Sequence, residues 1–127
     1  MPTVTMLYAG LLGLILLGLA FAAGRTRGRL KVSLGDGGHV ELLLAMRRHA
    51  NFVEYVPVIL VLMALLEMNG VTRTAIHAMG ISLVIARLAH AAGLSADTTG
   101  GAGRAVGAGV TALILLVASI WAVVAFF

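Results

Sequence analysis

The chain has 127 residues, of which 61% are hydrophobic and only 11% are charged, and it contains no cysteine. A soluble domain carries about 25% charged residues, so this composition excludes a soluble protein and indicates an integral membrane protein. Lys and Arg number 9 against 5 Asp and Glu. We assign this excess to membrane orientation and not to nucleic acid, because no aromatic residues alternate with the basic ones. Without cysteine, the protein has no disulfide, thiolate metal site or thiol nucleophile of its own.

The first predicted span covers residues 4–23, which include no charged residue. At about 1.5 Å per residue this stretch is long enough to cross the hydrocarbon layer. A cleaved signal peptide is the alternative, but the basic residues follow the apolar run, whereas in a signal peptide they precede it. These basic residues are Arg25, Arg27, Arg29 and Lys31.

The second predicted span covers residues 39–68 and follows a turn at Gly35-Asp36-Gly37-Gly38. Its first turns are polar on one side and its last turns are apolar throughout, so we expect it to begin in the membrane interface. Pro57 lies inside the span and tends to kink a helix. Asn69-Gly70 is typical of a helix end.

The third and fourth predicted spans cover residues 74–92 and 104–127, with a glycine-rich loop, 95–103, between them. Thr72 or Thr74 can cap the third span. We therefore expect one all-α domain over residues 1–127, an integral membrane bundle of four transmembrane helices. The fourth span ends in aromatic residues that suit the membrane interface, Trp121, Phe126 and Phe127.

The basic residues predict an orientation. Arg73 alone lies in the second loop, and the other eight lie on the side of the first and third loops. The positive-inside rule places these eight in the cytoplasm, so both termini are expected outside it.

A polar stripe opens the second span. At about 100° per residue, Arg47, Asn51 and Glu54 fall within about 60° of one another, and Arg48 and Tyr55 flank them. Lipid cannot satisfy such groups, so the stripe should face another helix or a wet cleft. Two interpretations stay open at this point. The stripe is a ligand site, or it is a buried network of an Arg47–Glu54 ion pair and an amide that only holds helices together.

Further polar residues are expected at the same depth. Arg87 and His90 lie three residues apart on the third span, hence on one face, and Arg104 begins the fourth span. Together with the stripe they form a net positive cluster. Such a cluster suits a ligand that carries carboxylates and an ammonium group.

These residues resemble a known family. Arg47-x-x-x-Asn51-x-x-Glu54-Tyr55-x-Pro57, followed by Arg87-Leu88-x-His90-x-x-Gly93, is similar to the pattern of the MAPEG family, the membrane-associated proteins of eicosanoid and glutathione metabolism. Gly35-Asp36-Gly37-Gly38 and Glu67-Met68-Asn69-Gly70 resemble its bacterial inner-membrane members. The resemblance implies a four-helix subunit, a homotrimer, and glutathione as cosubstrate, bound between subunits near the cytoplasmic leaflet.

The resemblance also implies roles for single residues. Arg47, Asn51, Glu54 and Tyr55 would hold the polar groups of glutathione, with Arg87 and His90 near the ligand. Arg104, or an arginine of the first helix, would stabilise the thiolate that attacks a lipophilic second substrate arriving through the bilayer. The chain departs from the family where catalytically competent members often carry tyrosines, near the end of the third span, since it has His90, Ala91, Ala92 and Leu94 there.

The alternative to a glutathione transferase or peroxidase is a non-catalytic membrane protein, or a small proton-coupled transporter that uses Glu54 as an intramembrane proton site. A neighbouring Arg47 argues against it, because a fixed cation keeps a carboxylate ionised. The histidines offer no convincing metal set.

Two smaller features have open interpretations. Gly103 and Gly107 form a GxxxG that indicates a close helix contact or mere membrane composition. Glu67 and Arg73 flank the second loop, where we expect them to meet water.

Overall fold

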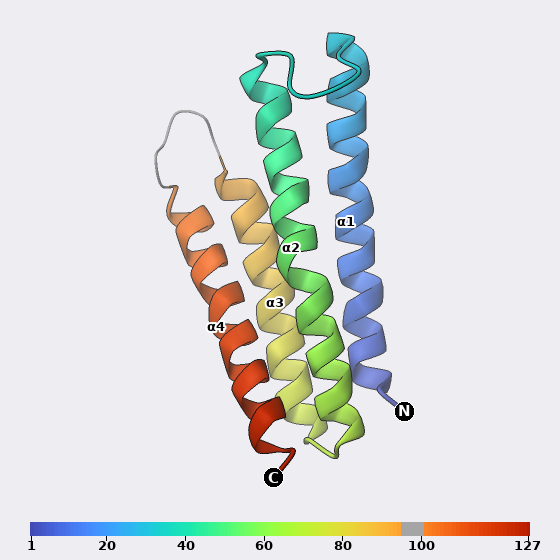
Figure 1. Cartoon of the computed structure of the whole chain (residues 1–127), viewed down its shortest axis with the longest axis vertical. Coiled ribbons are helices and arrows are strands. Elements are labelled where there is room, and N and C mark those ends of the chain that lie inside the picture. The colour runs from blue at the N-terminus through green and yellow to red at the C-terminus, as the bar shows by residue number, and fades with distance from the viewer. Residues whose placement is uncertain (95–100) are drawn as a thin grey trace.

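The computed structural model describes residues 1–94 and 101–127, and within them it forms four helices (Figure 1). Each is long and apolar enough to cross a membrane, which confirms the predicted all-α bundle of four spans. Most of the predicted glycine-rich loop, residues 95–100, lies outside the described residues. The helices are α1 (Thr3–Leu30), α2 (Val40–Met68), α3 (Arg73–Gly93) and α4 (Ala102–Val124).

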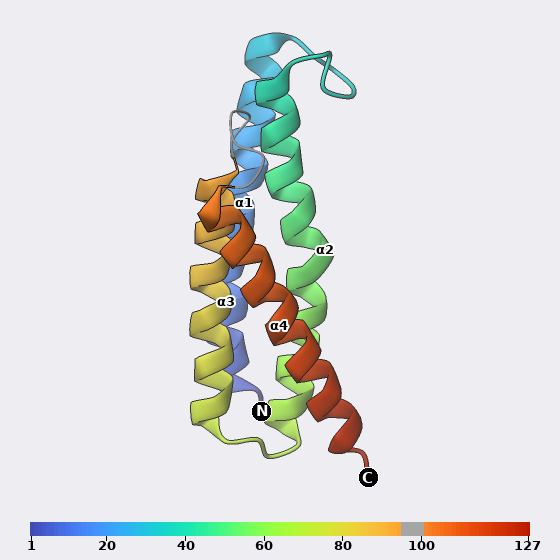
Figure 2. The same cartoon turned by 90° about the vertical axis from the view of Figure 1, so that its left-hand side faces the viewer.

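Helix α1 is longer than the predicted span 4–23, because it continues through the basic residues to Leu30. Arginine is a good helix former, so charge ends the apolar run without ending the helix. With 28 residues at about 1.5 Å each, α1 exceeds a hydrocarbon layer of about 30 Å. Together with the start of α2, its end therefore reaches beyond α3 and α4 (Figures 1 and 2).

The end of α2 is at the predicted residue, and the other boundaries differ from the predicted ones by one to three residues. Thr72 is the residue that caps α3, where its hydroxyl accepts a hydrogen bond from the amide of Ala75. Asn69 ends α2, and Gly70 follows with φ +88°, a conformation that favours glycine. Helix α2 runs through Pro57 without a break.

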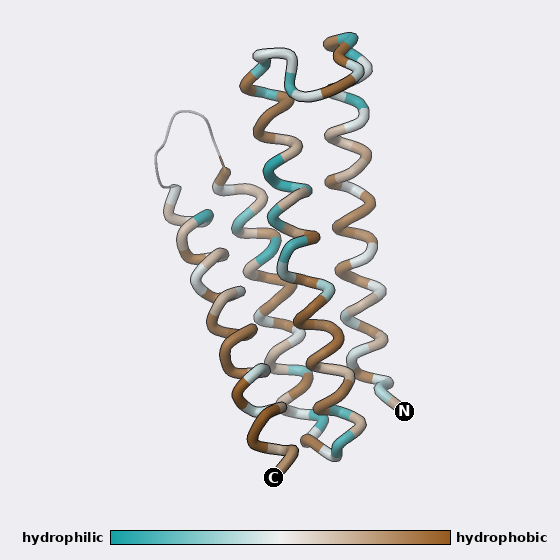
Figure 3. The backbone as a smooth tube through the Cα atoms, in the orientation of Figure 1, coloured by the Kyte–Doolittle hydropathy of each residue, from teal (hydrophilic) through white to brown (hydrophobic). Residues whose placement is uncertain are grey.

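The helices run alternately up and down, so both termini lie at one end of the bundle (Figure 1). Helix α1 packs along α2, and α3 packs along α4. The core is apolar and draws on all four helices, with Leu12, Ile59, Leu83 and Ala118 among its buried members. The hydropathy tube shows polar segments in the upper half of α2, near the upper end of α3 and at the start of α4, with mostly apolar helices below them as far as the polar turn between α2 and α3 (Figure 3).

Helices α3 and α4 approach so closely that only glycine fits at their contact. A Cβ at Gly107 would lie 2.4 Å from the carbonyl oxygen of Ala86, and one at Gly103 would lie 3.0 Å from that of Ala89. On the other side of the contact, a Cβ at Gly93 would lie 2.3 Å from the amide nitrogen of Arg104. The GxxxG sequence is therefore a close helix contact.

Glu67 is half-buried at the end of α2, and it does more than the contact with water that the sequence predicted. Its carboxylate accepts hydrogen bonds from the amides of Val4 and Thr5 and from the Thr5 hydroxyl, each at 2.8 Å. The first amides of a helix have no partner within the helix, and its N-terminus carries partial positive charge. Glu67 therefore caps α1 from the far end of α2.

At the opposite end, basic residues of α1 fasten the loop to α2. Arg27 donates hydrogen bonds to the carbonyl oxygens of Val32 and Gly35, and Arg29 forms an ion pair with Glu41. Of the described basic residues, eight lie at this end and Arg73 lies at the other. The grouping expected from the sequence is thus present in the bundle.

Candidate functional site

Arg87 is the centre of the polar cluster. It lies on α3 with only 1% of its surface exposed. Its guanidinium donates to Asn51 Oδ1 on α2 at 2.8 Å and to Thr111 Oγ1 on α4 at 3.4 Å, and it contacts His90 Nδ1 at 3.2 Å. One side chain thereby connects three helices.

The charge of Arg87 has no counter-ion among the described residues, whose only ion pair joins Arg29 to Glu41. Its carbon Cζ lies 5.6 Å from the centre of the Phe52 ring, a cation–π contact that partly replaces water. Its Nε is buried with no partner in the described part of the chain. A buried cation without a carboxylate is costly, and such groups mark functional sites in membrane helices.

A cavity of about 300 Å³ adjoins this cluster between α2, α3 and α4. The polar groups in its wall are Asn51, Tyr55, Arg87 and Thr111. Small residues of α4 leave the space open, because Ala108, Gly109 and Ala112 project little into it. The cavity thus combines a guanidinium, an amide and two hydroxyls.

Arg47 and Glu54 do not join this cluster. Both side chains are exposed, and neither makes a hydrogen bond or ion pair with any described residue. The buried residues of α2 explain why, since Val56 lies about 180° round the helix from Arg47. The predicted stripe is therefore divided: Asn51 turns toward Arg87, while Arg47 and Glu54 face away from the core of their own subunit. A buried Arg47–Glu54 ion pair within the subunit is excluded.

The remaining predicted residues lie at the same end of the bundle. His90 is 5% exposed and contacts Arg87, so it is a buried residue of the cluster. Arg104 is half-buried in the first turn of α4, and its backbone packs against Gly93. Arg48, which flanks the stripe, donates to the carbonyl oxygen of Leu94 and so ties α2 to the end of α3.

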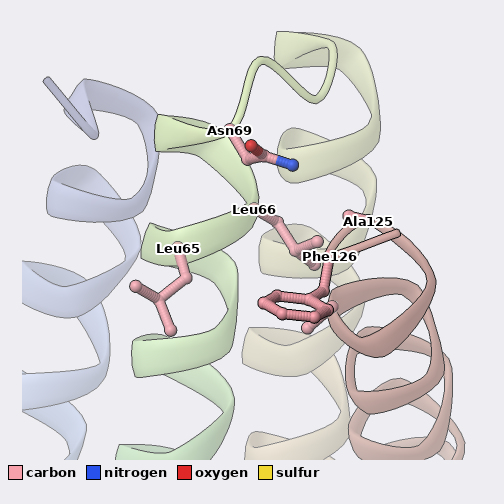
Figure 4. A pocket seen from close by; sticks show the side chains of 6 residues that line it. Leu65, Leu66, Asn69, Ala125 and Phe126 are labelled. Carbon is pink, nitrogen blue, oxygen red and sulfur yellow. The ribbon is translucent and has the colours of Figure 1, made fainter.

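A second cavity, of about 430 Å³, lies at the opposite end of the bundle between the ends of α2 and α4. The close-up shows Phe126 and Leu66 beside each other, with Asn69 above them (Figure 4). No charged side chain lines this cavity. It lacks groups for a charged ligand, so the cavity beside Arg87 is the better candidate site.

Two contributors to this arrangement were not singled out from the sequence. Thr111 and Phe52 both contact Arg87. The only signal for Thr111 was a hydroxyl residue within an apolar helix that also contains Ser119, and the Thr111 hydroxyl donates to the Gly107 carbonyl at 2.7 Å. Such bonds are common in membrane helices and do not by themselves indicate a site.

A model of the MAPEG family matches residues 5–124, nearly the whole chain. The chain belongs to the MAPEG family. It is 45% identical over 87 residues to the inner membrane protein YecN of Escherichia coli K12, and equally to YecN of Escherichia coli O6:H1. That match covers 68% of this chain and 66% of YecN, so the chain aligns with slightly less than two thirds of its relative's length. No solved structure matches the chain. Four candidate spans and an inner-membrane relative together support an integral inner-membrane location.

Proposed function

We propose that this protein binds glutathione in the membrane and acts as a glutathione transferase or peroxidase on lipophilic electrophiles. The observation that carries the proposal is the cavity lined by Asn51, Tyr55 and Arg87 at the basic end of a MAPEG-family bundle. A buried, uncompensated guanidinium beside an open space favours a ligand with negative charge.

The side chains suit the functional groups of glutathione. Its two carboxylates match the guanidiniums at this end, of which Arg47 is exposed and without a partner among the described residues. Its ammonium group matches the carboxylate of Glu54. Asn51 and Tyr55 offer an amide and a hydroxyl for the peptide groups, and Arg87 and His90 lie directly behind Asn51.

The outward direction of Arg47 and Glu54 supports a site between subunits. Both lie on a span, and lipid cannot satisfy their charges. A second copy of the chain can cover them. We therefore propose a homotrimer in which glutathione lies between neighbouring subunits on the cytoplasmic side, with both termini outside the cytoplasm.

The proposed transferase step is a displacement. The thiolate sulfur of glutathione forms a bond to an electrophilic carbon, and the leaving group departs with the electron pair of the bond that breaks. In the peroxidase reaction, two glutathione molecules are oxidised to their disulfide while a hydroperoxide is reduced to an alcohol and water. We assign stabilisation of the thiolate to Arg104, with an arginine of α1 as the alternative, because a nearby guanidinium lowers the pKa of a thiol.

Glutathione binding to the purified protein in detergent, measured by isothermal titration calorimetry, tests the proposal. Arg47→Ala should weaken binding about tenfold to a hundredfold, as expected for one lost charged hydrogen-bond partner. Lys31→Gln is the matched control, because it removes an exposed positive charge from the same end of the bundle. A wild-type protein that does not bind glutathione would refute the proposal. Equal losses in both variants would show that general positive charge, and not Arg47, attracts the ligand.

One observation favours the second candidate, a proton-coupled transporter. Glu54 is exposed on a membrane span and forms no ion pair with Arg47 in the described chain. The sequence argument against a proton site assumed that Arg47 lies against this carboxylate, and within one subunit it does not. Reconstituted protein in vesicles with a pH gradient separates the two functions. The enzyme should carry no proton flux, whereas a transporter should carry a flux that Glu54→Gln abolishes.

A further inference from the structure

The contacts of Arg87 restrict how its neighbours can be protonated and oriented. A guanidinium has donors and no acceptor. Each of its three polar partners must therefore accept: Asn51 through Oδ1, His90 through Nδ1 and Thr111 through Oγ1. Thr111 fits this requirement, because its own proton is donated to the Gly107 carbonyl at 2.7 Å and its lone pairs remain free to accept.

The same restriction fixes the amide of Asn51. With Oδ1 held 2.8 Å from Arg87, Nδ2 carries two protons and has no acceptor among the described residues. In the described chain, the only buried side-chain nitrogen or oxygen atoms without a partner are Arg48 Nε and Arg87 Nε, so Nδ2 is not enclosed. It is therefore accessible as a donor, on a residue that lines the 300 Å³ cavity.

His90 is fixed in a similar way. Because Nδ1 accepts from Arg87, the ring is neutral and its proton lies on Nε2. A proton on Nδ1 would point at the guanidinium from 3.2 Å. Nε2 has no acceptor among the described residues. It is also not one of the buried atoms without a partner, so it remains accessible as a donor.

From this geometry we infer that Arg87 is a positioning residue, which fixes the tautomer of His90 and holds Asn51 so that its amide presents an N–H donor to the ligand of the cavity. Nη1 and Nη2 of Arg87 are committed to partners on α2, α3 and α4, so Arg87 attracts the negative charge of the ligand while Asn51 makes the direct hydrogen bond. The inference rests on the proposed function for the identity of the ligand, glutathione. The fixed tautomer of His90 is independent of that function.

Nuclear magnetic resonance of the protein labelled with ¹⁵N-histidine tests the tautomer. Long-range proton–nitrogen correlations should show His90 with Nδ1 unprotonated and Nε2 protonated, and in Arg87→Met they should show a mixture of tautomers. Nδ1 should stay unprotonated when glutathione is added. A protonated Nδ1 in the wild type, before or after glutathione is added, would overturn the inference. So would a single unchanged tautomer in a folded Arg87→Met protein.

Asn51→Asp tests the amide without depending on the Arg87 variant. A carboxylate can still accept from Arg87, so the thermal midpoint should equal or exceed that of the wild type, but the N–H donor is lost. We expect glutathione to bind about tenfold to a hundredfold more weakly. The matched control is Asn69→Asp, the same change at the other end of α2, which should leave binding unaltered.

The outcomes separate this inference from the proposed function. A folded Asn51→Asp protein that binds glutathione like the wild type would refute the donor role while the proposed function stands. If the wild type binds no glutathione, the proposed function fails, and the tautomer of His90 still decides whether Arg87 positions its neighbours.

Discussion

Replacing Gly107 by alanine should separate α4 from α3 and disturb the cluster round Arg87. The new Cβ would lie 2.4 Å from the Ala86 carbonyl oxygen and 2.7 Å from the His90 amide nitrogen. Ordinary contacts begin at 3.4 Å, so the helices must move apart by about 1 Å, and overpacking of this kind costs about 1–3 kcal/mol. The hydrogen bond from Arg87 to Thr111, already 3.4 Å long, should break with this movement.

Gly109→Ala provides the matched control on the same helix. A Cβ there meets nothing within 4 Å, so only the helix propensity of alanine should count, a gain of about 0.5–1 kcal/mol. That gain is common to both variants and cancels in their difference. The difference in unfolding free energy should therefore be the overpacking cost of about 1–3 kcal/mol.

Unfolding in detergent, followed by the fluorescence of the single tryptophan, Trp121 on α4, measures this difference. Equal stability of the two alanine variants would contradict the close contact between α3 and α4. A loss of stability with no change in the His90 resonances would show that the contact holds the fold but not the site.

Two further predictions concern the ends of the bundle. Glu67→Ala should lower the unfolding free energy by about 1–2 kcal/mol, because it leaves the first amides of α1 without their carboxylate cap. The control, Glu41→Ala, removes an exposed ion pair and should change the unfolding free energy by less than about 1 kcal/mol. Equal losses for the two variants in the same denaturation assay would contradict the cap. Because the chain has no cysteine, single cysteines can test the orientation in intact bacterial cells: a membrane-impermeant maleimide should label Asn69→Cys and not Leu34→Cys, and the reverse pattern would place both termini in the cytoplasm.

Much of the fold followed from the sequence because the bilayer is a demanding solvent. Every backbone group in lipid must be paired within the chain, so an apolar run of sufficient length becomes a helix whatever its neighbours are. The four spans and their turns were predictable for this reason. Helix α1 was placed several residues too short, since its basic residues mark the edge of the apolar layer and not the end of the helix.

The candidate site was predictable in some of its residues but not in its contacts. Spacing placed Arg47, Asn51 and Glu54 on one side of a helix, and the structure divides them, because Asn51 borders the core face of α2 while the other two lie opposite it. The phase of a stripe relative to the core depends on which neighbours pack against the helix. That information is spread over α1, α3 and α4.

The sequence by itself determined that this protein lies in a lipid bilayer, and it determined the four spans, the end at which the basic residues gather and the family to which the chain belongs. These are properties of composition, order and local spacing. The tertiary structure alone decided that Arg87 is buried against Asn51, His90 and Thr111, that Gly107 admits α3 to close contact, and that Glu67 caps a helix more than 60 residues away in the chain. The physical reason is that these contacts join helices distant in sequence, and their geometry exists only once the helices have packed.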